Sequence, residues 1–188
     1  MRFCLWLTLG LTLMGRAWAG TITLELTPST ASVSPGESVT MNAEISGIGV
    51  PGAAEVGSFD IFVGFNSALL APEGVTFGAL LGNASASQAL TGSTVSPGRV
   101  EAAEVSFLSN AQLDALQTTS SFTLATFSFE GIGSGTAAFT FEGGPIDDGN
   151  GNLIAGTKAV IPEPDPLPLL VMLLAAGVPG LRRLCRLQ

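Results

Sequence analysis

The chain has 188 residues, of which 46% are hydrophobic and 12% charged, and its formal net charge at pH 7 is −8. It has no histidine, and its two cysteines, Cys4 and Cys185, lie near the two ends. The missing histidine excludes Ser-His triads, histidine metal sites and histidine general bases. The central part, which has no cysteine, cannot hold thiol catalysis, zinc-thiolate sites or disulfides. The acidic balance disfavours nucleic acid as a partner.

The first 19 residues have the three-part pattern of a secretory signal peptide. Arg2 provides a positive start, residues 3–14 form an apolar run, and Ala17 and Ala19 give a small-x-small cleavage site. We therefore expect the exported protein to begin at Gly20. The alternative, a short N-terminal transmembrane helix, would need roughly 20 apolar residues, more than this run contains.

Residues 20–161 are expected to form one domain, because they are numerous enough to bury a single core. This part contains two basic residues, Arg99 and Lys158, against thirteen acidic ones, which gives a net charge of −11. Such an acidic exterior suits solubility outside the cell and attracts cations. Without a disulfide, the domain must be stabilised by packing alone.

An alternation of apolar and polar residues predicts that this domain is all-β. The pattern is clearest at residues 21–26, 38–45, 59–65 and 136–142. Residues 110–117 predict one short helix, with Asn110 as its N-cap and Leu113 and Leu116 on one face. Residues 82–94, rich in Ala, Ser, Gly and Thr, are expected to form a loop.

One predicted strand, at residues 122–129, breaks the alternation. Phe122 and Leu124 are even-numbered, whereas Phe127 and Phe129 are odd-numbered. Either the strand is buried on both sides, or a β-bulge near residues 125–126 shifts its phase. We favour the bulge.

Short segments with Gly and Pro separate the strands and predict turns. They lie at residues 34–36, 50–52, 71–74, 96–98 and 143–145. Many short strands joined by such turns favour a β-sandwich or jelly roll.

An acidic, glycine-containing segment near residue 148 is a candidate cation site. Asp148, Asn150 and Asn152 place oxygen ligands at alternate positions, as Ca²⁺ requires, but no glutamate follows within reach. Asp-Gly and Asn-Gly also favour a hairpin turn. We therefore predict a turn, with weak Ca²⁺ binding as a compatible second interpretation and no other cofactor.

Catalysis by a carboxylate pair is the remaining enzymatic alternative. Glu101 and Glu104 are the nearest pair, but their spacing in a strand places them on opposite faces. Both are expected to be solvated surface charges. A serine–lysine pair would depend on Lys158, the sole lysine. We therefore predict that the protein is not an enzyme.

Residues 34–40 (SPGESVT) and 56–70 (VGSFDIFVGFNSALL) resemble the start of a cohesin domain, and residues 121–129 (SFTLATFSF) followed by 131–141 are similar to its later strands. Ser67 and Ala68 stand where the family usually has its proline region. The resemblance implies a flattened jelly-roll sandwich of about nine strands that acts as a binding module. A binding module predicts a patch of apolar and polar residues on one sheet face, around Phe62, whereas a matrix filler predicts a uniformly polar exterior.

The C-terminal segment, residues 162–188, combines three features. Pro162, Glu163 and Pro164 come first, residues 167–181 are mostly apolar, and a basic tip of Arg182, Arg183 and Arg186 follows. The apolar stretch predicts a short transmembrane helix with its arginines on the cytoplasmic side. An ordinary tail anchor is one alternative. A GPI signal, the other, would lack the arginine cluster.

This order of features resembles the PEP-CTERM sorting signal of Gram-negative bacteria. In that family a membrane-embedded exosortase recognises the Pro-Glu-Pro motif and removes or exchanges the tail. Asp165, Pro166 and Cys185 depart from the usual pattern. The resemblance implies an exported protein that is anchored in the inner membrane before processing and then reaches the cell surface or matrix, with a link to exopolysaccharide and biofilm. The expected ligand of the sandwich is a protein or a polysaccharide, and the alternative is a filler or simple membrane-anchored protein without a specific ligand.

Overall fold

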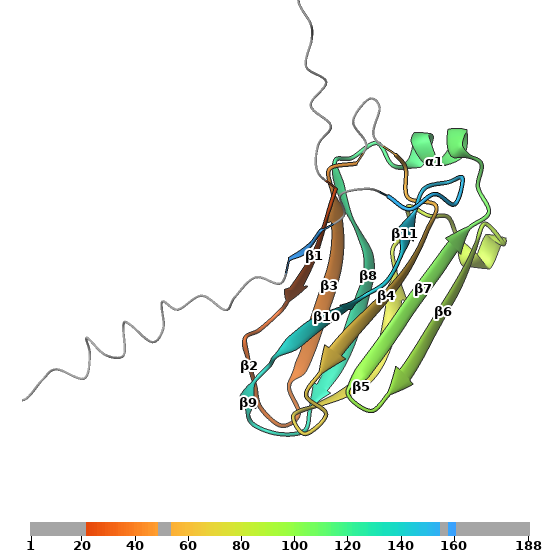
Figure 1. Cartoon of the computed structure of the whole chain (residues 1–188). Helices are drawn as coiled ribbons and strands as arrows, with labels where there is room; N and C mark the ends of the chain where they lie inside the picture. Colours follow the sequence, from red (N-terminus) through yellow and green to blue (C-terminus); the bar gives the residue numbers. More distant parts are fainter. Residues whose placement is uncertain (1–21, 49–53, 155–157, 161–188) are drawn as a thin grey trace, which may run out of the picture.

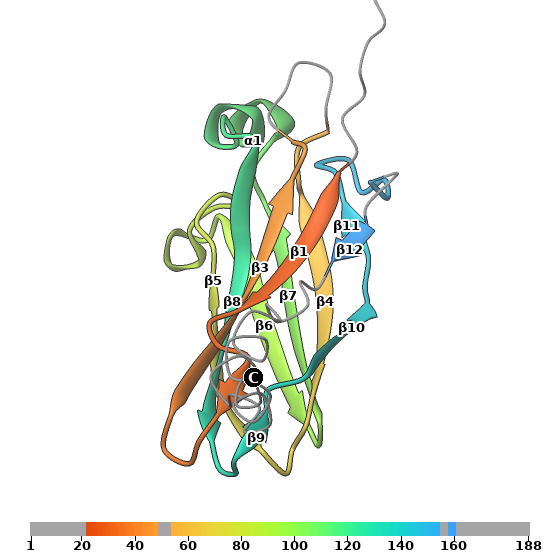
Figure 2. The same ribbon diagram turned by 90° about the vertical axis from the view of Figure 1, so that its left-hand side faces the viewer.

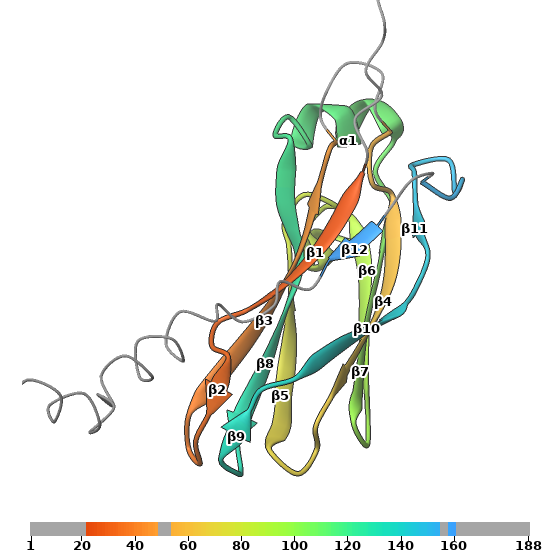
Figure 3. The same ribbon diagram turned by 60° about the vertical axis from the view of Figure 1, so that its left-hand side comes forward.

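The computed structural model describes residues 22–48 and 54–154, and the backbone of residues 158–160. In this part of the chain two β-sheets pack face to face, as Figure 3 shows, and enclose one hydrophobic core. The all-β sandwich predicted from the sequence is confirmed. Within the described residues, no helix has the length and apolar character needed to cross a membrane.

The predictions for both chain ends concern residues outside the described ones. They are the signal peptide with Ala17, Ala19 and Gly20, and the C-terminal segment with Pro162, Glu163, Pro164, Arg182, Arg183 and Arg186.

The described residues form twelve strands, of which nine have three or more residues, in line with the expected number. The strands are β1 (Thr23–Pro28), β2 (Ser32–Val33), β3 (Ser38–Ser46), β4 (Ser58–Phe65), β5 (Leu70–Phe77), β6 (Ala89–Ser96), β7 (Arg99–Ser106), β8 (Ser121–Gly131), β9 (Gly135–Thr136), β10 (Phe139–Gly143), β11 (Ile146–Asp147) and β12 (Lys158–Val160). Two short helices join them, η1 (Ala84–Ala86) and α1 (Asn110–Leu116).

One sheet has the strand order β12-β1-β3-β8-β5, and the other has the order β10-β4-β7-β6, with β11 also paired to β4. All these pairs are antiparallel except β1 with β12. In chain order the strands change sheet between β3 and β4, β4 and β5, β5 and β6, β7 and β8, β8 and β10, and β11 and β12. Figure 2 shows α1 at one end of the sandwich and the β2–β9 pair at the other. β5 and β6 are the edge strands on the same side.

The alternation in the sequence correctly predicts which side chains enter the core. In β3, Val39, Met41, Ala43 and Ile45 are fully buried while the intervening residues face outward. β4 buries its odd-numbered residues in the same way. These inward faces pack against each other because removing apolar surface from water is the main favourable term available to a domain without disulfides.

The β-bulge predicted in the phase-breaking strand is confirmed, one residue earlier than expected. In β8, Ala125 lies opposite Ala43, whereas Thr123 lies opposite Glu44, so Leu124 is the additional residue. Leu124 and Ala125 are both buried. This shift allows the even-numbered and odd-numbered phenylalanines of one strand to face the same core.

Two predictions of irregular structure are wrong. The segment at residues 71–74 is not a turn, because Pro72 and Gly74 lie within β5, where the register shifts around Glu73. An edge strand tolerates a proline and a bulge because one side of its backbone has no partner strand. The loop predicted at residues 82–94 contains η1 and most of β6, an edge strand that is largely exposed and therefore lacks a hydrophobic alternation.

The predicted helix is present, but its N-cap is Ser109 rather than Asn110. Ser109 has an extended backbone, and its N–H and hydroxyl both donate to the side-chain oxygen of Gln112. Leu113 is buried, whereas Leu116 is 39% exposed, so Leu113 is the residue of α1 whose side chain packs into the interior.

Gln117, at the C-terminal end of α1, is a buried polar residue that connects three segments. Its side-chain oxygen accepts a hydrogen bond of 2.8 Å from the Val56 N–H. Its amide nitrogen donates to the carbonyls of Val56, at 2.8 Å, and Leu80, at 3.1 Å. Gln117 thus fixes α1 to the start of β4 and to the segment after β5.

We expect Gln117→Ala to lower the free energy of unfolding by about 2–3 kcal/mol, because it leaves two buried backbone groups of Val56 and the part-buried carbonyl of Leu80 without this partner. The matched control is Gln112→Ala, which removes an exposed capping contact and is expected to cost about 1 kcal/mol or less. Urea unfolding monitored by circular dichroism measures both. Equal losses in the two variants would contradict the role assigned to Gln117.

Candidate functional site

The two outward faces of the sandwich differ in chemistry. On the sheet that contains β3 and β8, the outward side chains of the central strands are serine, threonine, asparagine and glutamate. They include Ser38, Thr40, Asn42, Glu44, Thr123, Thr126, Ser128 and Glu130. Within the described residues, no large exposed hydrophobic side chain belongs to β1, β3 or β8.

The outward face of the β10-β4-β7-β6 sheet carries an exposed apolar patch formed by Leu90, Val105 and Phe107. Leu90 and Val105 lie opposite each other on neighbouring strands and are 63% and 46% exposed. Phe107 directly follows β7, donates its backbone N–H to the Gln88 carbonyl and is 62% exposed. Figure 1 shows these two strands side by side at the edge of the molecule.

The same sheet carries a charged cluster on its outward face, formed by Asp60, Phe62, Arg99, Glu101 and Glu142. The Arg99 guanidinium carbon lies 3.9 Å from the centre of the Phe62 ring, and its Nε lies 3.3 Å from a Glu142 carboxylate oxygen. This arrangement places the cation over the face of an aromatic ring. Three carboxylates against one guanidinium leave the cluster negatively charged.

Asp60 is the least solvated carboxylate of the charged cluster. Its Oδ1 is buried and has no hydrogen-bond partner. Burial and the nearby Glu101 raise the pKa of Asp60, and Arg99 partly opposes this rise. A basic group from a partner would relieve both the missing hydrogen bond and the repulsion.

Glu101 and Glu104 lie on opposite faces of β7, as predicted, but the prediction that both are solvated is wrong. Glu104 is only 1% exposed, and its neighbours across the ladders are Phe59 and Thr91. The sequence contained a signal for this burial, because Glu104 shares the even-numbered phase of Val100 and Ala102, which face the core.

Glu104 lines a pocket of about 340 Å³, which we call the Glu104 pocket. Burial raises the pKa of the Glu104 carboxyl to about 7, and its Oε2 has no hydrogen-bond partner. The other lining residues come from the end of β5, from the segment around η1 and from β6, and they are Phe77, Gly78, Ala79, Gly82, Asn83, Ala84 and Thr91.

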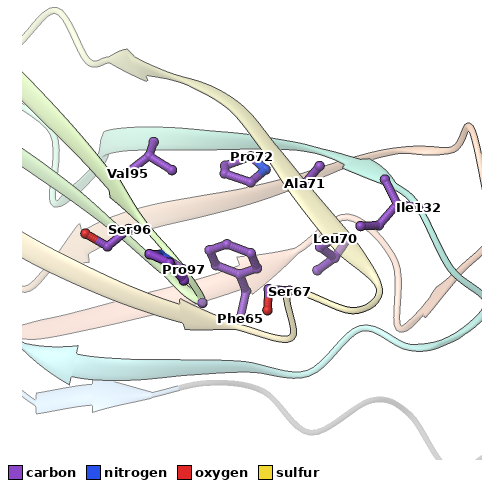
Figure 4. A pocket seen from close by; sticks show the side chains of 10 residues that line it. Phe65, Ser67, Leu70, Ala71, Pro72, Val95, Ser96, Pro97 and Ile132 are labelled. Carbon is purple, nitrogen blue, oxygen red and sulfur yellow. The ribbon is translucent and has the colours of Figure 1, made fainter.

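A second pocket, of about 390 Å³, lies at the opposite end of the same open side of the sandwich. Figure 4 shows Phe65, Leu70, Pro72, Val95 and Ile132 around it. The Pro97–Gly98 turn closes one side, and Gly98 has the positive φ of 76° that this turn requires. None of its described lining residues is charged, so it offers apolar contacts and a few hydroxyls.

The acidic segment predicted as a turn forms one, closed by a bridge between Asp147 and Leu153. The Oδ1 of Asp148 accepts hydrogen bonds of 2.8 Å from the backbone N–H groups of Asn150 and Asn152. The Asn152 side chain also donates to the carboxylate, and these bonds lower the pKa of Asp148.

The structure thus brings Asp148, Asn150 and Asn152 together. The Asp148 carboxylate accepts hydrogen bonds from the other two residues, and the three side chains do not surround a space for an ion. Among the residues that the structure describes, no group of three or more acidic, cysteine or histidine side chains could hold a metal ion. Weak Ca²⁺ binding at this turn stays a prediction.

The family model of the Cohesin domain matches residues 24–161 of the chain. No curated protein shows a match. Solved structures with the same fold include a chain of a type II cohesin–X–dockerin complex from Acetivibrio cellulolyticus. It has a TM-score of 0.62 and 12% identity, over 76% of this chain and 96% of that one.

Two further similar structures are cohesins from other bacteria. A type II cohesin from Bacteroides cellulosolvens has a TM-score of 0.62 and 17% identity, over 75% of this chain and 96% of that one. A solution structure from Clostridium acetobutylicum has a TM-score of 0.57 and 19% identity, over 76% and 87% of the two chains. At these identities the likeness concerns the fold.

Glu104 is expected to make the stability of the domain depend on pH. Its pKa is raised from 4.5 to about 7 on folding, so the folded state binds more protons between these values. The free energy of unfolding therefore falls as the pH rises through this window, by roughly 2–3 kcal/mol between pH 5 and pH 8. The side chain introduced by Glu104→Gln cannot ionise, so this variant should lose the pH dependence of the free energy of unfolding that Glu104 causes.

Urea unfolding at pH 5 and pH 8 provides the measurement, with the exposed Glu130→Gln as the control. We expect Glu104→Gln to gain stability relative to the wild type at pH 8, whereas Glu130→Gln follows the wild type at both pH values. Parallel pH dependence in the wild type and Glu104→Gln would show that Glu104 is solvated.

Proposed function

The chain belongs to the cohesin domain family, and from this premise we propose that it is a non-catalytic binding module whose ligand is a protein. The single observation that carries the proposal is the exposed apolar patch of Leu90, Val105 and Phe107 on one sheet face. The opposite sheet is polar across its central strands, so the exterior is not the uniformly polar one expected of a matrix filler.

The chemistry of this face indicates what the partner must offer. Its apolar patch favours a partner with aliphatic or aromatic side chains, since such anchors supply most of the energy at protein interfaces. The charged cluster favours basic side chains in register with Asp60, Glu101 and Glu142. The proposed partner is therefore a protein segment that is apolar at one end and basic at the other.

A dockerin-type protein is the partner we propose, because a structural relative from Acetivibrio cellulolyticus forms a cohesin–X–dockerin complex. A polysaccharide is less well supported. The chain has no tyrosine, and its two tryptophans, Trp6 and Trp18, lie within the predicted signal peptide. The domain thus lacks the two aromatic residues that combine a stacking face with a hydrogen-bonding group.

Export and C-terminal processing complete the proposal. The motif Pro162-Glu163-Pro164, the apolar stretch and the arginines at 182, 183 and 186 support processing by an exosortase. In this proposal the chain is anchored in the inner membrane until its tail is removed or exchanged. The sandwich is then displayed at the cell surface or in the matrix, where a link to exopolysaccharide and biofilm is expected.

Charge reversal on the apolar patch tests the binding face. We expect the double variant Leu90→Asp/Val105→Asp to weaken binding of a dockerin-bearing protein of the same organism by tenfold or more, because it places charge in a desolvated contact. The matched control, Thr40→Asp/Thr126→Asp, alters the polar sheet and should bind like the wild type. Isothermal titration calorimetry with each purified dockerin measures the affinities.

Equal weakening by both double variants would place the contact elsewhere. Absence of binding to every dockerin of the organism would contradict the proposed partner class.

Intact mass spectrometry tests the processing. In the native host, we expect a mature mass that ends near residues 162–165 and that disappears when the exosortase is deleted. An unprocessed tail in both strains would indicate a simple membrane anchor, and the link to biofilm would then lose its support.

A further inference from the structure

The Glu104 pocket lies on the open side of the sandwich, between the edge strands β5 and β6. Thr91 of β6 lies opposite Glu104 of β7, and Phe77 and Gly78 approach from the end of β5. Ala79, Gly82, Asn83 and Ala84 complete the wall, with η1 beside the upper end of β6 in Figure 1. The pocket is thus built from both sheets and differs from the outward face proposed above.

The Glu104 carboxyl has no partner of its own within this pocket. It is 1% exposed, and its Oε2 accepts no hydrogen bond. None of the other lining residues from β5, η1 or β6 is ionisable. Arg99 is on the opposite face of β7, where it contacts Phe62 and Glu142. A buried acceptor without a donor is costly, and a ligand that supplies the donor would offset that cost.

The pocket walls indicate what kind of donor fits. Phe77, Ala79 and Ala84 offer apolar contacts, whereas Thr91 adds a hydroxyl. Ca²⁺ requires about six to eight oxygen ligands, and the pocket supplies a single carboxylate. A compact monovalent cation on an aliphatic stem matches both features, because an ammonium group carries three donors and its stem can pack on apolar walls.

We propose that the Glu104 pocket binds a primary alkylammonium group through the Glu104 carboxylate. The ammonium donates hydrogen bonds to the carboxylate, and the alkyl stem lies against the apolar wall. The group can come from the lysine side chain of a partner protein or from a free small amine. The test separates these sources and needs no dockerin.

The raised pKa of Glu104 gives the proposal a quantitative signature. The carboxyl must be ionised to hold the cation, and the amine stays protonated up to a pH of about 10. With a carboxyl pKa of about 7, the ionised fraction rises about 30-fold between pH 5.5 and pH 8. The association constant for the amine should rise by the same factor.

The experiment titrates the folded domain with n-butylammonium chloride at pH 5.5 and pH 8, and follows the backbone amide signals of Gly78 and Thr91 by NMR. We expect shifts at these residues that saturate at pH 8 and require about 30-fold more ligand at pH 5.5. Glu104→Gln should weaken binding at pH 8 by tenfold or more, whereas Glu130→Gln should leave it unchanged. Neutral n-butanol is the control for purely apolar binding.

Two further probes distinguish the sources of the amine. Binding of Nα-acetyl-lysine methylamide with the affinity of n-butylammonium would indicate a lysine of a partner. Binding of n-butylammonium alone would indicate a free amine. The proposal is overturned if n-butylammonium does not bind at pH 8, if n-butanol binds equally well, or if Glu104→Gln binds as the wild type does.

Discussion

The shift of phase in β8 is the constraint on which the rest of the sandwich depends. β8 is a central strand paired with both β3 and β5, and the additional residue Leu124 turns Phe127 and Phe129 toward the same core as Phe122. The ring of Phe129 then lies 5.2 Å from that of Phe65 and 5.3 Å from that of Phe139, across the two sheets. Without the bulge, one of the two sets of phenylalanines would face water. A domain without disulfides would then lose much of the contact between its layers.

Because the inward faces of both sheets are buried in the core, a partner can contact only the surfaces outside it. The outward face of the sheet with β3 and β8 carries mainly serine, threonine and glutamate side chains, which water solvates well. The outward face of the other sheet combines exposed apolar side chains with a charged cluster around Arg99. The exposed apolar side chains on this second face are the observation that supports the proposed partner there, because apolar patches on a protein surface favour contact with another protein.

The sequence predicted those parts of the structure that depend on periodicity. The alternation in β3 and β4 identified the buried faces, and the parity change between Leu124 and Phe127 identified the bulge. Prediction from the sequence failed where the secondary structure of a segment depends on its neighbours in the fold. Pro72 is accommodated because β5 is an edge strand, and β6 forms by pairing with β7 although its own composition is that of a loop. Glu104 is buried despite its charge, because it shares the strand phase of Val100 and Ala102. The lining of its pocket comes from segments that no local pattern brings together.

If the Glu104 pocket binds an amine as proposed, Glu104 connects the stability of the domain with ligand binding. A carboxyl at an inward position of β7 is ionised only at a cost, since burial raises its pKa to about 7. An apolar residue there would continue the series of Val100 and Ala102 without that cost. A bound cation restores to the carboxylate the interaction that burial removed, so it must stabilise the folded state as well as bind to it. The same ligand should therefore protect the domain most at the pH values where the empty pocket weakens it. Under the proposal, the stability of the domain above pH 7 would increase with the concentration of the amine.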